Sequence, residues 1–190
     1  MGIPATTAAP SPTSVREVAI VPLPQADVAL GSWQDTYTRA GQLGMPAHVT
    51  LVAPHDATEA TSAALSDALR GAATGTPAFD AVLVRTSRFA DENLITLPDD
   101  PTPFHALFDA VTPKLAHAAP PRFDYVPHVS VAMRSQGAPI DDLERAVREL
   151  LPITEPVREA WIMRRTGDGP WLVHERVALA GTELDTPARN

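Results

Sequence analysis

A four-residue pattern occurs twice in the chain, and it constrains the fold and the chemistry more than any other feature of the sequence. His48-Val49-Thr50-Leu51 and His128-Val129-Ser130-Val131 each place a histidine and a hydroxyl side chain two positions apart in an apolar run. Side chains alternate between the faces of a strand, so the histidine and the hydroxyl of each copy point the same way. Two such strands side by side would present two imidazoles and two hydroxyl donors to one surface. This combination suits acid–base chemistry on a phosphate ester.

The composition excludes several classes of protein. The chain has 190 residues, of which 44% are hydrophobic, as in ordinary globular domains, and no cysteine, which excludes disulfides and thiolate metal sites. A net charge of −8 argues against a broad basic face for long RNA or DNA, but it is compatible with a small nucleotide or a short RNA end. No apolar run approaches the roughly 18 residues of a membrane span. We therefore expect a cytoplasmic monomer with no membrane partner.

One folded unit, residues 15–181, is predicted between two tails. The tails, 1–14 and 182–190, combine Pro, Ser, Thr and Ala with little apolar mass, which is typical of disorder. Apolar periodicity and Gly or Pro at the ends define the elements between them. In chain order these are a strand at 15–23, a helix at 25–43, the first motif strand, a helix at 58–73, a hairpin of 79–89 and 93–97, a helix at 103–118, the second motif strand, a helix at 140–151 and a hairpin of 157–165 and 171–180.

The buried faces of two helices, and two further aromatic positions, can also be predicted. Apolar spacing places inward the residues Val28, Leu30, Trp33 and Tyr37 in the first helix and Ala60, Ala64, Leu65 and Leu69 in the second. Phe89 and Trp171, at the two hairpins, are expected in the core.

The order of elements after the first motif returns after the second. In each case a helix and then a proline lead into a hairpin. His48 and Pro77 are 77 − 48 = 29 residues apart, and His128 and Pro156 are 156 − 128 = 28 apart. This agreement predicts a duplicated unit. A pseudo-twofold axis between the halves would bring the two imidazoles to face each other across a substrate.

The two His-x-Ser/Thr motifs, 128 − 48 = 80 residues apart, resemble those of the 2H phosphoesterase superfamily. The likeness is strongest to bacterial 2′-5′ RNA ligases and RNA cyclic phosphodiesterases, and it extends over about residues 15–181. It includes Gly44-Met45-Pro46-Ala47 before the first histidine and Pro127 before the second. The resemblance implies an α+β bilobal fold, with two antiparallel sheets around a central cleft and helices outside. It also implies cleavage of 2′,3′-cyclic phosphates or 2′-5′ linkages without a metal or other cofactor.

The resemblance also assigns roles to the motif residues. His48 and His128 would be the general acid and base, and Thr50 and Ser130 would hold the non-bridging phosphate oxygens. Family precedent favours His128 as the base that activates water and His48 as the acid, an assignment that the residues alone leave open. Because an imidazole titrates near pH 6.5, it can supply either role, and losing one usually costs about 10²–10⁴-fold in rate.

One of the departures from the family pattern concerns an arginine. Many relatives have an arginine five residues after the second histidine, where this chain has Met133 and places Arg134 one position later. Strand alternation would send Arg134 to the face of His128 and Ser130, where it would contact the substrate.

Several further residues allow two interpretations. Tyr125 either stacks on a base or packs in the core, and Arg164 and Arg165 either attract phosphate or end a solvated strand. The other histidines are expected to be structural or exposed, because none has the strand-and-hydroxyl setting: His55, His105, His117 and His174.

Three hypotheses for the function follow. The first is a phosphodiesterase. The second is a binding module that holds a phosphorylated ligand or a protein without turnover. The third is ligation of RNA ends, which reverses the chemistry of the first.

Overall fold

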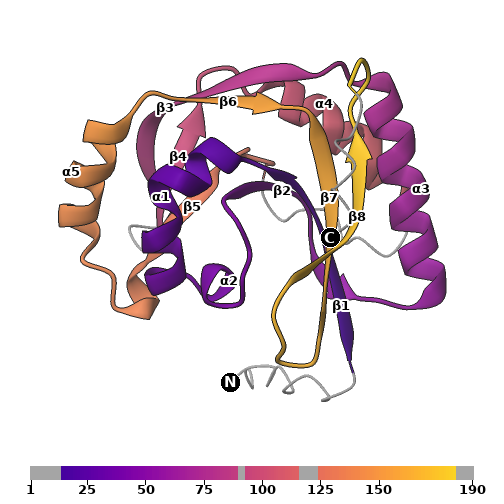
Figure 1. The fold of residues 1–190 in the computed structure, drawn as a ribbon, viewed down its shortest axis with the longest axis horizontal. Coiled ribbons are helices and arrows are strands. Elements are labelled where there is room, and N and C mark those ends of the chain that lie inside the picture. Colours follow the sequence, from indigo (N-terminus) through magenta and orange to yellow (C-terminus); the bar gives the residue numbers. More distant parts are fainter. Residues whose placement is uncertain (1–13, 90–92, 116–123, 183–190) are drawn as a thin grey trace, which may run out of the picture.

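Two four-stranded antiparallel sheets form the two lobes of the computed structural model, which describes residues 14–89, 93–115 and 124–182 (Figure 1). Sheet one has the strand order β2 (His48–Asp56), β1 (Val15–Pro22), β7 (Glu159–Thr166), β8 (Leu172–Ala178). Sheet two has the order β5 (Val129–Met133), β4 (Asn93–Pro98), β3 (Phe79–Phe89), β6 (Ile153–Val157). These sheets, with their helices, confirm the predicted bilobal α+β fold.

The chain order explains why the lobes resemble each other. β1 and β2 are joined by α1 (Pro24–Tyr37) and α2 (Arg39–Gln42), and β4 and β5 are joined by α4 (Thr102–Val111). The next helix of the first half, α3 (Glu59–Gly75), leads to β3 in the opposite sheet. The next helix of the second half, α5 (Ile140–Leu150), leads first to β6 in its own sheet and then to β7 in the opposite sheet. β3 thus pairs with β4 in sheet two, and β7 pairs with β1 in sheet one. The duplication is present as two halves that exchange strands.

One strand and the role of one proline were not predicted correctly. Pro156 was predicted to lead directly into the second hairpin, but it lies within an additional strand, β6, opposite Asp80 of β3. β6 is an outer strand of sheet two, and proline is tolerated on an edge strand because its missing N–H breaks no ladder there. Because proline is rare in strands, its presence was the reason that this short strand was not predicted.

The helix predicted over 25–43 is interrupted at Thr38, whose backbone is extended (φ −131°, ψ 142°). The Thr38 hydroxyl donates to the Gln34 carbonyl at 2.9 Å and accepts from the Gly41 N–H at 2.9 Å, so it ends α1 and caps α2. Gly41 makes this turn possible, because a Cβ there would lie 2.4 Å from the backbone of Gln34. The prediction for Val28 was wrong: it is 86% exposed, and the buried face consists of Ala26, Leu30 and Gln34.

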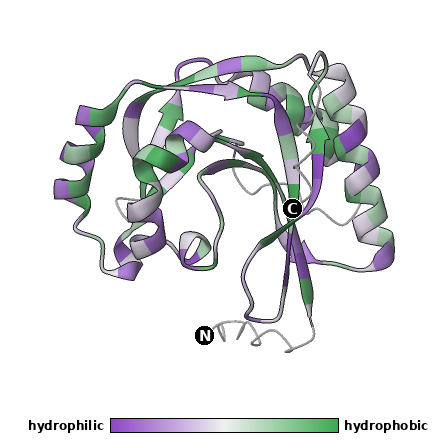
Figure 2. Ribbon diagram, in the orientation of Figure 1, coloured by the Kyte–Doolittle hydropathy of each residue, from purple (hydrophilic) through white to green (hydrophobic). Residues whose placement is uncertain are grey.

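The other helices largely follow their predictions. Thr58 caps α3, which buries Leu65 and Leu69 against the sheet as predicted, but Ala60 lies exposed in the first turn. α4 ends at Val111, earlier than predicted, and residues 116–118 of that prediction lie outside the described residues. α3 and α5 each contain both hydrophobic and hydrophilic residues, as expected of helices that cover a sheet (Figure 2). None of the described helices is long and apolar enough to cross a membrane.

The ends of the folded part are held by hydrogen bonds. The Ser14 carbonyl accepts from the Gly167 N–H at 2.8 Å, and the Thr182 hydroxyl donates to the Leu179 carbonyl at 2.7 Å. Both residues had been assigned to the tails. The rest of the predicted tails, residues 1–13 and 183–190, lie outside the described residues.

The main core orients the motif strands. The alternate motif residues Val49, Leu51, Val129 and Val131 are all buried in it. The histidine and hydroxyl of each motif therefore project from the other face of their strand. On that face of sheet one lies a second apolar group, here called the minor cluster, formed by Val18, Ile20, Met45, Met163 and Trp171.

Candidate active site

The two motif strands meet where the lobes join. β2 is an outer strand of sheet one and β5 an outer strand of sheet two, and the two strands contact each other. His48 is the first residue of β2, and His128 immediately precedes β5. The imidazoles are close enough that the charge of His128 lowers the pKa of His48. Tertiary folding therefore brings together two residues that are 80 positions apart.

The two imidazoles are held in the same way. The Nδ1 of His48 lies 2.7 Å from the Pro46 carbonyl oxygen, and the Nδ1 of His128 lies 2.7 Å from the Val126 carbonyl oxygen. A carbonyl can only accept, so Nδ1 is the protonated nitrogen of each neutral ring. The Nε2 atoms are left to exchange protons with a substrate or with water.

His55 is a useful comparison. Its Nδ1 lies 3.2 Å from the Ala53 carbonyl oxygen, so the local hydrogen bond alone does not distinguish a catalytic histidine. His55 lies opposite Glu17 of β1, whose carboxylate binds Arg164 and Ser62. Cross-strand neighbours share a face. Glu17 and Ile20 are three positions apart in β1, so their side chains project from opposite faces. Thr50 lies opposite Ile20, and His55 therefore faces away from Thr50.

Burial lowers the pKa of both His48 and His128. The backbone hydrogen bond partly opposes this shift in each ring, and the Asp27 carboxylate opposes it further at His48 alone. The neutral forms, which can act as bases, are therefore favoured in the free protein. A bound phosphate anion would act in the opposite direction and favour an imidazolium.

The hydroxyl residues are held through their backbones. The Tyr125 hydroxyl donates to the Thr50 carbonyl at 3.0 Å, and the Gln34 amide donates to the Ser130 carbonyl at 2.6 Å. Each of these bonds links a motif strand to a residue from the other half of the chain. The side-chain hydroxyls of Thr50 and Ser130 have no hydrogen-bond partner within the described residues, and both residues are half-buried. They are available as donors to a ligand.

Tyr125 is a packing residue in this structure. Its ring stacks on Phe108 with 3.9 Å between centroids and 7° between planes, and it meets the edge of His105 at 5.4 Å. Burial raises the pKa of its hydroxyl, which donates to Thr50. Of the two interpretations of Tyr125, base stacking and core packing, these contacts support core packing.

Arg134 lies outside the strand, so the alternation of side chains along β5 does not determine where it points. β5 ends at Met133, and residues Arg134–Gln136 form a short 3-10 turn. Arg134 is exposed, and its contact with a substrate stays a prediction.

Two residues near the histidines were not expected there. Phe89, predicted to be core, is 38% exposed and meets the His128 ring edge-to-face at 4.7 Å. The Asp27 carboxylate accepts the Ala47 N–H at 2.7 Å, directly before His48. An aspartate in the first turn of a helix usually complements the helix dipole, so nothing in the sequence distinguishes Asp27.

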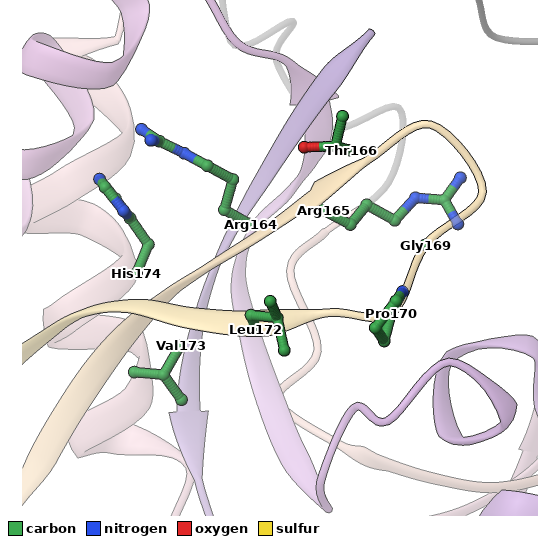
Figure 3. A pocket seen from close by; sticks show the side chains of 8 residues that line it. All are labelled: Arg164, Arg165, Thr166, Gly169, Pro170, Leu172, Val173 and His174. Atoms are coloured by element: carbon green, nitrogen blue, oxygen red, sulfur yellow. The ribbon is translucent and has the colours of Figure 1, made fainter. Parts of the chain in front are cut away.

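A pocket of about 350 Å³ lies elsewhere, at the β7–β8 hairpin (Figure 3). Arg164 and His174 extend to the same side of it, whereas Arg165 extends toward the turn. Arg164 lies opposite Glu17, and His48 lies opposite Pro22, five residues further along β1. At about 3.3 Å per residue these rows are roughly 17 Å apart, so the pocket is separate from the histidines. Of the basic residues there, Arg164 is neutralised by Glu17, and Arg165 lies over the Trp171 ring.

The fold and the site together define a class of protein: duplicated α+β lobes that each supply one His-x-Ser/Thr strand to a common edge. A family model, that of the 2′-5′ RNA ligase superfamily, matches residues 22–169. The chain belongs to this superfamily, which confirms the resemblance to the 2H phosphoesterases.

Solved structures show the same fold. LigT of E. coli complexed with 3′-AMP superposes with a TM-score of 0.64 at 17% identity, covering 87% of this chain and 98% of LigT. TT0787 of Thermus thermophilus gives a TM-score of 0.62 at 20% identity, covering 88% of this chain and all of TT0787 (100%). A protein described as a phosphoesterase gives 0.63 at 16% identity, covering 88% of this chain and 99% of its own. No curated protein matches the chain by sequence.

Proposed function

We propose that the protein is a metal-independent phosphodiesterase that opens a 2′,3′-cyclic phosphate or cleaves a 2′-5′ bond in a nucleotide or RNA end. The observation that carries the proposal is the matched pair of imidazoles, each held through Nδ1 with Nε2 left for proton exchange, at the junction of β2 and β5. LigT has been crystallised with 3′-AMP and with ATP, and small nucleotides of this kind fit the proposal.

Two histidines suffice for the reaction. The neutral imidazole takes a proton from water as the water oxygen bonds to phosphorus. The bond from phosphorus to one ribose oxygen breaks, and the imidazolium protonates that oxygen. The product is a phosphate monoester beside a free hydroxyl, and proton exchange with water restores both rings. Thr50 and Ser130 would donate hydrogen bonds to the non-bridging oxygens, where charge grows in the transition state.

The other two hypotheses predict different results. A binding module would hold the nucleotide without turnover. Such a module would have no need of a proton-carrying histidine in each of the two motifs. A ligase would run the same step backwards, with a ribose hydroxyl in place of water. Among the described residues, no three His, Asp or Glu side chains gather as metal ligands would, so the proposal assigns the chemistry to the histidines alone.

The proposal is tested by incubating the protein with nucleoside 2′,3′-cyclic phosphates in EDTA. We expect turnover that chelation does not reduce. His48→Ala and His128→Ala should each lower the rate by at least about 10²-fold, because each removes one proton carrier from the same step. His55→Ala is the matched control, since His55 makes the same local hydrogen bond on the other face of β2. Loss of turnover on chelation, or near wild-type activity in either motif variant, would contradict the proposal.

A further inference from the structure

A row of cross-strand neighbours runs across sheet one from Thr50. Thr50 lies opposite Ile20 of β1, and Ile20 lies opposite Trp161 of β7. Arg176 of β8 is in turn the opposite neighbour of Trp161. Directly opposite residues project from the same face of an antiparallel sheet, so Trp161 shares the face of Thr50 and His48. Two strand spacings of about 4.8 Å place Trp161 roughly 10 Å from Thr50.

Trp161 forms a fixed, partly exposed aromatic surface at this position. Its ring packs against the minor cluster and is not fully buried. The guanidinium of Arg176 lies over the ring, 5.7 Å from its centroid. Glu159 accepts from Arg176 at 2.9 and 2.7 Å, which holds the guanidinium in place. Aromatic rings and guanidinium planes are both surfaces on which nucleobases stack, so an aromatic ring with an ordered guanidinium over it suits a base.

The corresponding row in sheet two lacks the aromatic ring. Ser130 lies opposite Ile95 of β4, and Ile95 lies opposite Ser87 of β3. Ile95 repeats the position of Ile20, but Ser87 stands where sheet one has Trp161. The two lobes thus offer similar hydroxyl residues and unequal surroundings. A ligand with a phosphate at one end and a flat, apolar ring at the other would be oriented by this difference.

We propose that Trp161 and the Arg176 guanidinium that lies over it form the surface on which the nucleobase of the ligand stacks. This inference rests on the proposed function, because it takes the phosphate to lie at the histidines and Thr50. The ribose would bridge the interval between Thr50 and Trp161. The exposed ring of sheet two, Phe89, lies edge-on against His128 and outside the row of Ser130, so the base lies over sheet one. This asymmetry of the lobes fixes the direction in which the nucleotide binds.

Binding measurements by calorimetry test the proposal without requiring turnover. The probes are adenosine 3′-monophosphate and methyl riboside 3-phosphate, which lacks the base. Trp161→Leu should weaken binding of the nucleotide by about 5- to 150-fold, the range measured for base–aromatic stacking, and leave the base-free compound unchanged. Trp161→Phe should restore most of the loss. Trp171→Leu is the matched control, because Trp171 also belongs to the minor cluster and also has an arginine, Arg165, over its ring.

A fluorescence measurement leaves position 161 intact, in case Trp161→Leu does not fold. The chain has three tryptophans, so the double variant Trp33→Phe/Trp171→Phe retains only Trp161. Adenosine 3′-monophosphate should quench its fluorescence, and methyl riboside 3-phosphate should not. Equal affinity of the wild-type protein for both compounds, or no quenching by the nucleotide, would overturn the proposal. A protein that binds the nucleotide through Trp161 but hydrolyses no cyclic phosphate would instead contradict the proposed function alone.

Discussion

At the scale of single residues, the proposed reaction depends on the protonation states of His48 and His128. Burial lowers the pKa of both below the ordinary value of 6.5, so the state with one ring neutral and one charged is most populated on the acid side of that value. We expect a bell-shaped dependence of kcat/KM on pH with its optimum below about 6.5. Its two limbs belong to the interacting pair. An optimum at or above neutrality would contradict this expectation.

Asp27 allows a sharper test of the same electrostatics. Asp27→Asn keeps an oxygen that can accept the Ala47 N–H but removes the charge that favours the imidazolium of His48. The pKa of His48 should fall further, and that of His128 should change less. NMR titration of the ring protons of each histidine measures both directly. Equal shifts of the two rings would show that Asp27 acts through the structure of the site and not through its charge.

The hydroxyls of Thr50 and Ser130 should affect rate and not protonation. Thr50→Val and Ser130→Ala each remove one proposed donor to phosphate and should lower kcat by up to about 10²–10³-fold at an unchanged pH optimum. The measurement is the rate against pH with a cyclic nucleotide. Thr96→Val is the control, because Thr96 is fully buried and lies opposite Val129, on the core side of the strands. A displaced optimum would mean that the hydroxyls tune the histidines.

At the scale of elements, α1 is a helix that contacts both lobes. It supplies Gln34 to the Ser130 carbonyl and Asp27 to the Ala47 N–H, so both motif strands depend on its position. Its first turn is capped by Glu155 of β6, a fully buried carboxylate that accepts from the N–H groups of Gln25 and Ala26 at 2.8 and 3.0 Å. β6, the strand that was not predicted from the sequence, thus fixes the start of α1.

Glu155 makes the stability of the fold depend on pH. Burial raises its pKa above the ordinary value of 4.5, although the two backbone hydrogen bonds oppose the shift. The folded state then binds its proton more tightly than the unfolded state, so stability falls as the pH rises from about 4.5 through the raised pKa. Glu155→Gln keeps an oxygen acceptor without a charge, and its advantage over the wild-type protein should grow across this window. Thermal unfolding at several pH values measures the difference.

Glu144 provides a control of opposite sign. Burial alone would raise its pKa, but hydrogen bonds from Arg88 and Thr86 hold it below the ordinary value. Its contribution to stability is therefore present above that value and is lost as the pH falls through the lowered pKa. Glu144→Gln should accordingly lose its stability difference from the wild-type protein in acid. If Glu155→Gln and Glu144→Gln respond alike to pH, the burial argument for Glu155 fails.

At the scale of the whole molecule, duplication and asymmetry act together. The exchange of β3 and β7 between the halves means that each sheet contains strands from both, and residues 15–181 are expected to fold as one unit. The cross-lobe bonds from Tyr125 and Gln34 hold β2 and β5 in one arrangement. The symmetric features are the histidines, and the asymmetric ones are Asp27, Phe89 and Trp161. In the proposed reaction the symmetric set would transfer protons, and Trp161 of the asymmetric set would distinguish the two ends of a substrate.

The sequence by itself determined what is local. Alternation along a strand is a property of the backbone, so the faces of His48 and Thr50 and the burial of Val49 and Leu51 could be predicted from four residues. Two copies of the motif predicted that two imidazoles would come together, and the structure places them at the junction of β2 and β5. The first hairpin and most helix boundaries followed from the same short-range signals.

Only the tertiary structure decided which distant segments became neighbours. The exchange of strands between the halves, the pairing of β6 with β3, and the approach of Asp27 and Phe89 to the histidines join residues far apart in the chain. No local period encodes such contacts. Val28 shows the same limit, because its apolar character did not reveal that the neighbouring sheet would bury Ala26 and Leu30 instead. Which side of a helix is covered depends on the element packed against it, and that element is chosen by the whole fold.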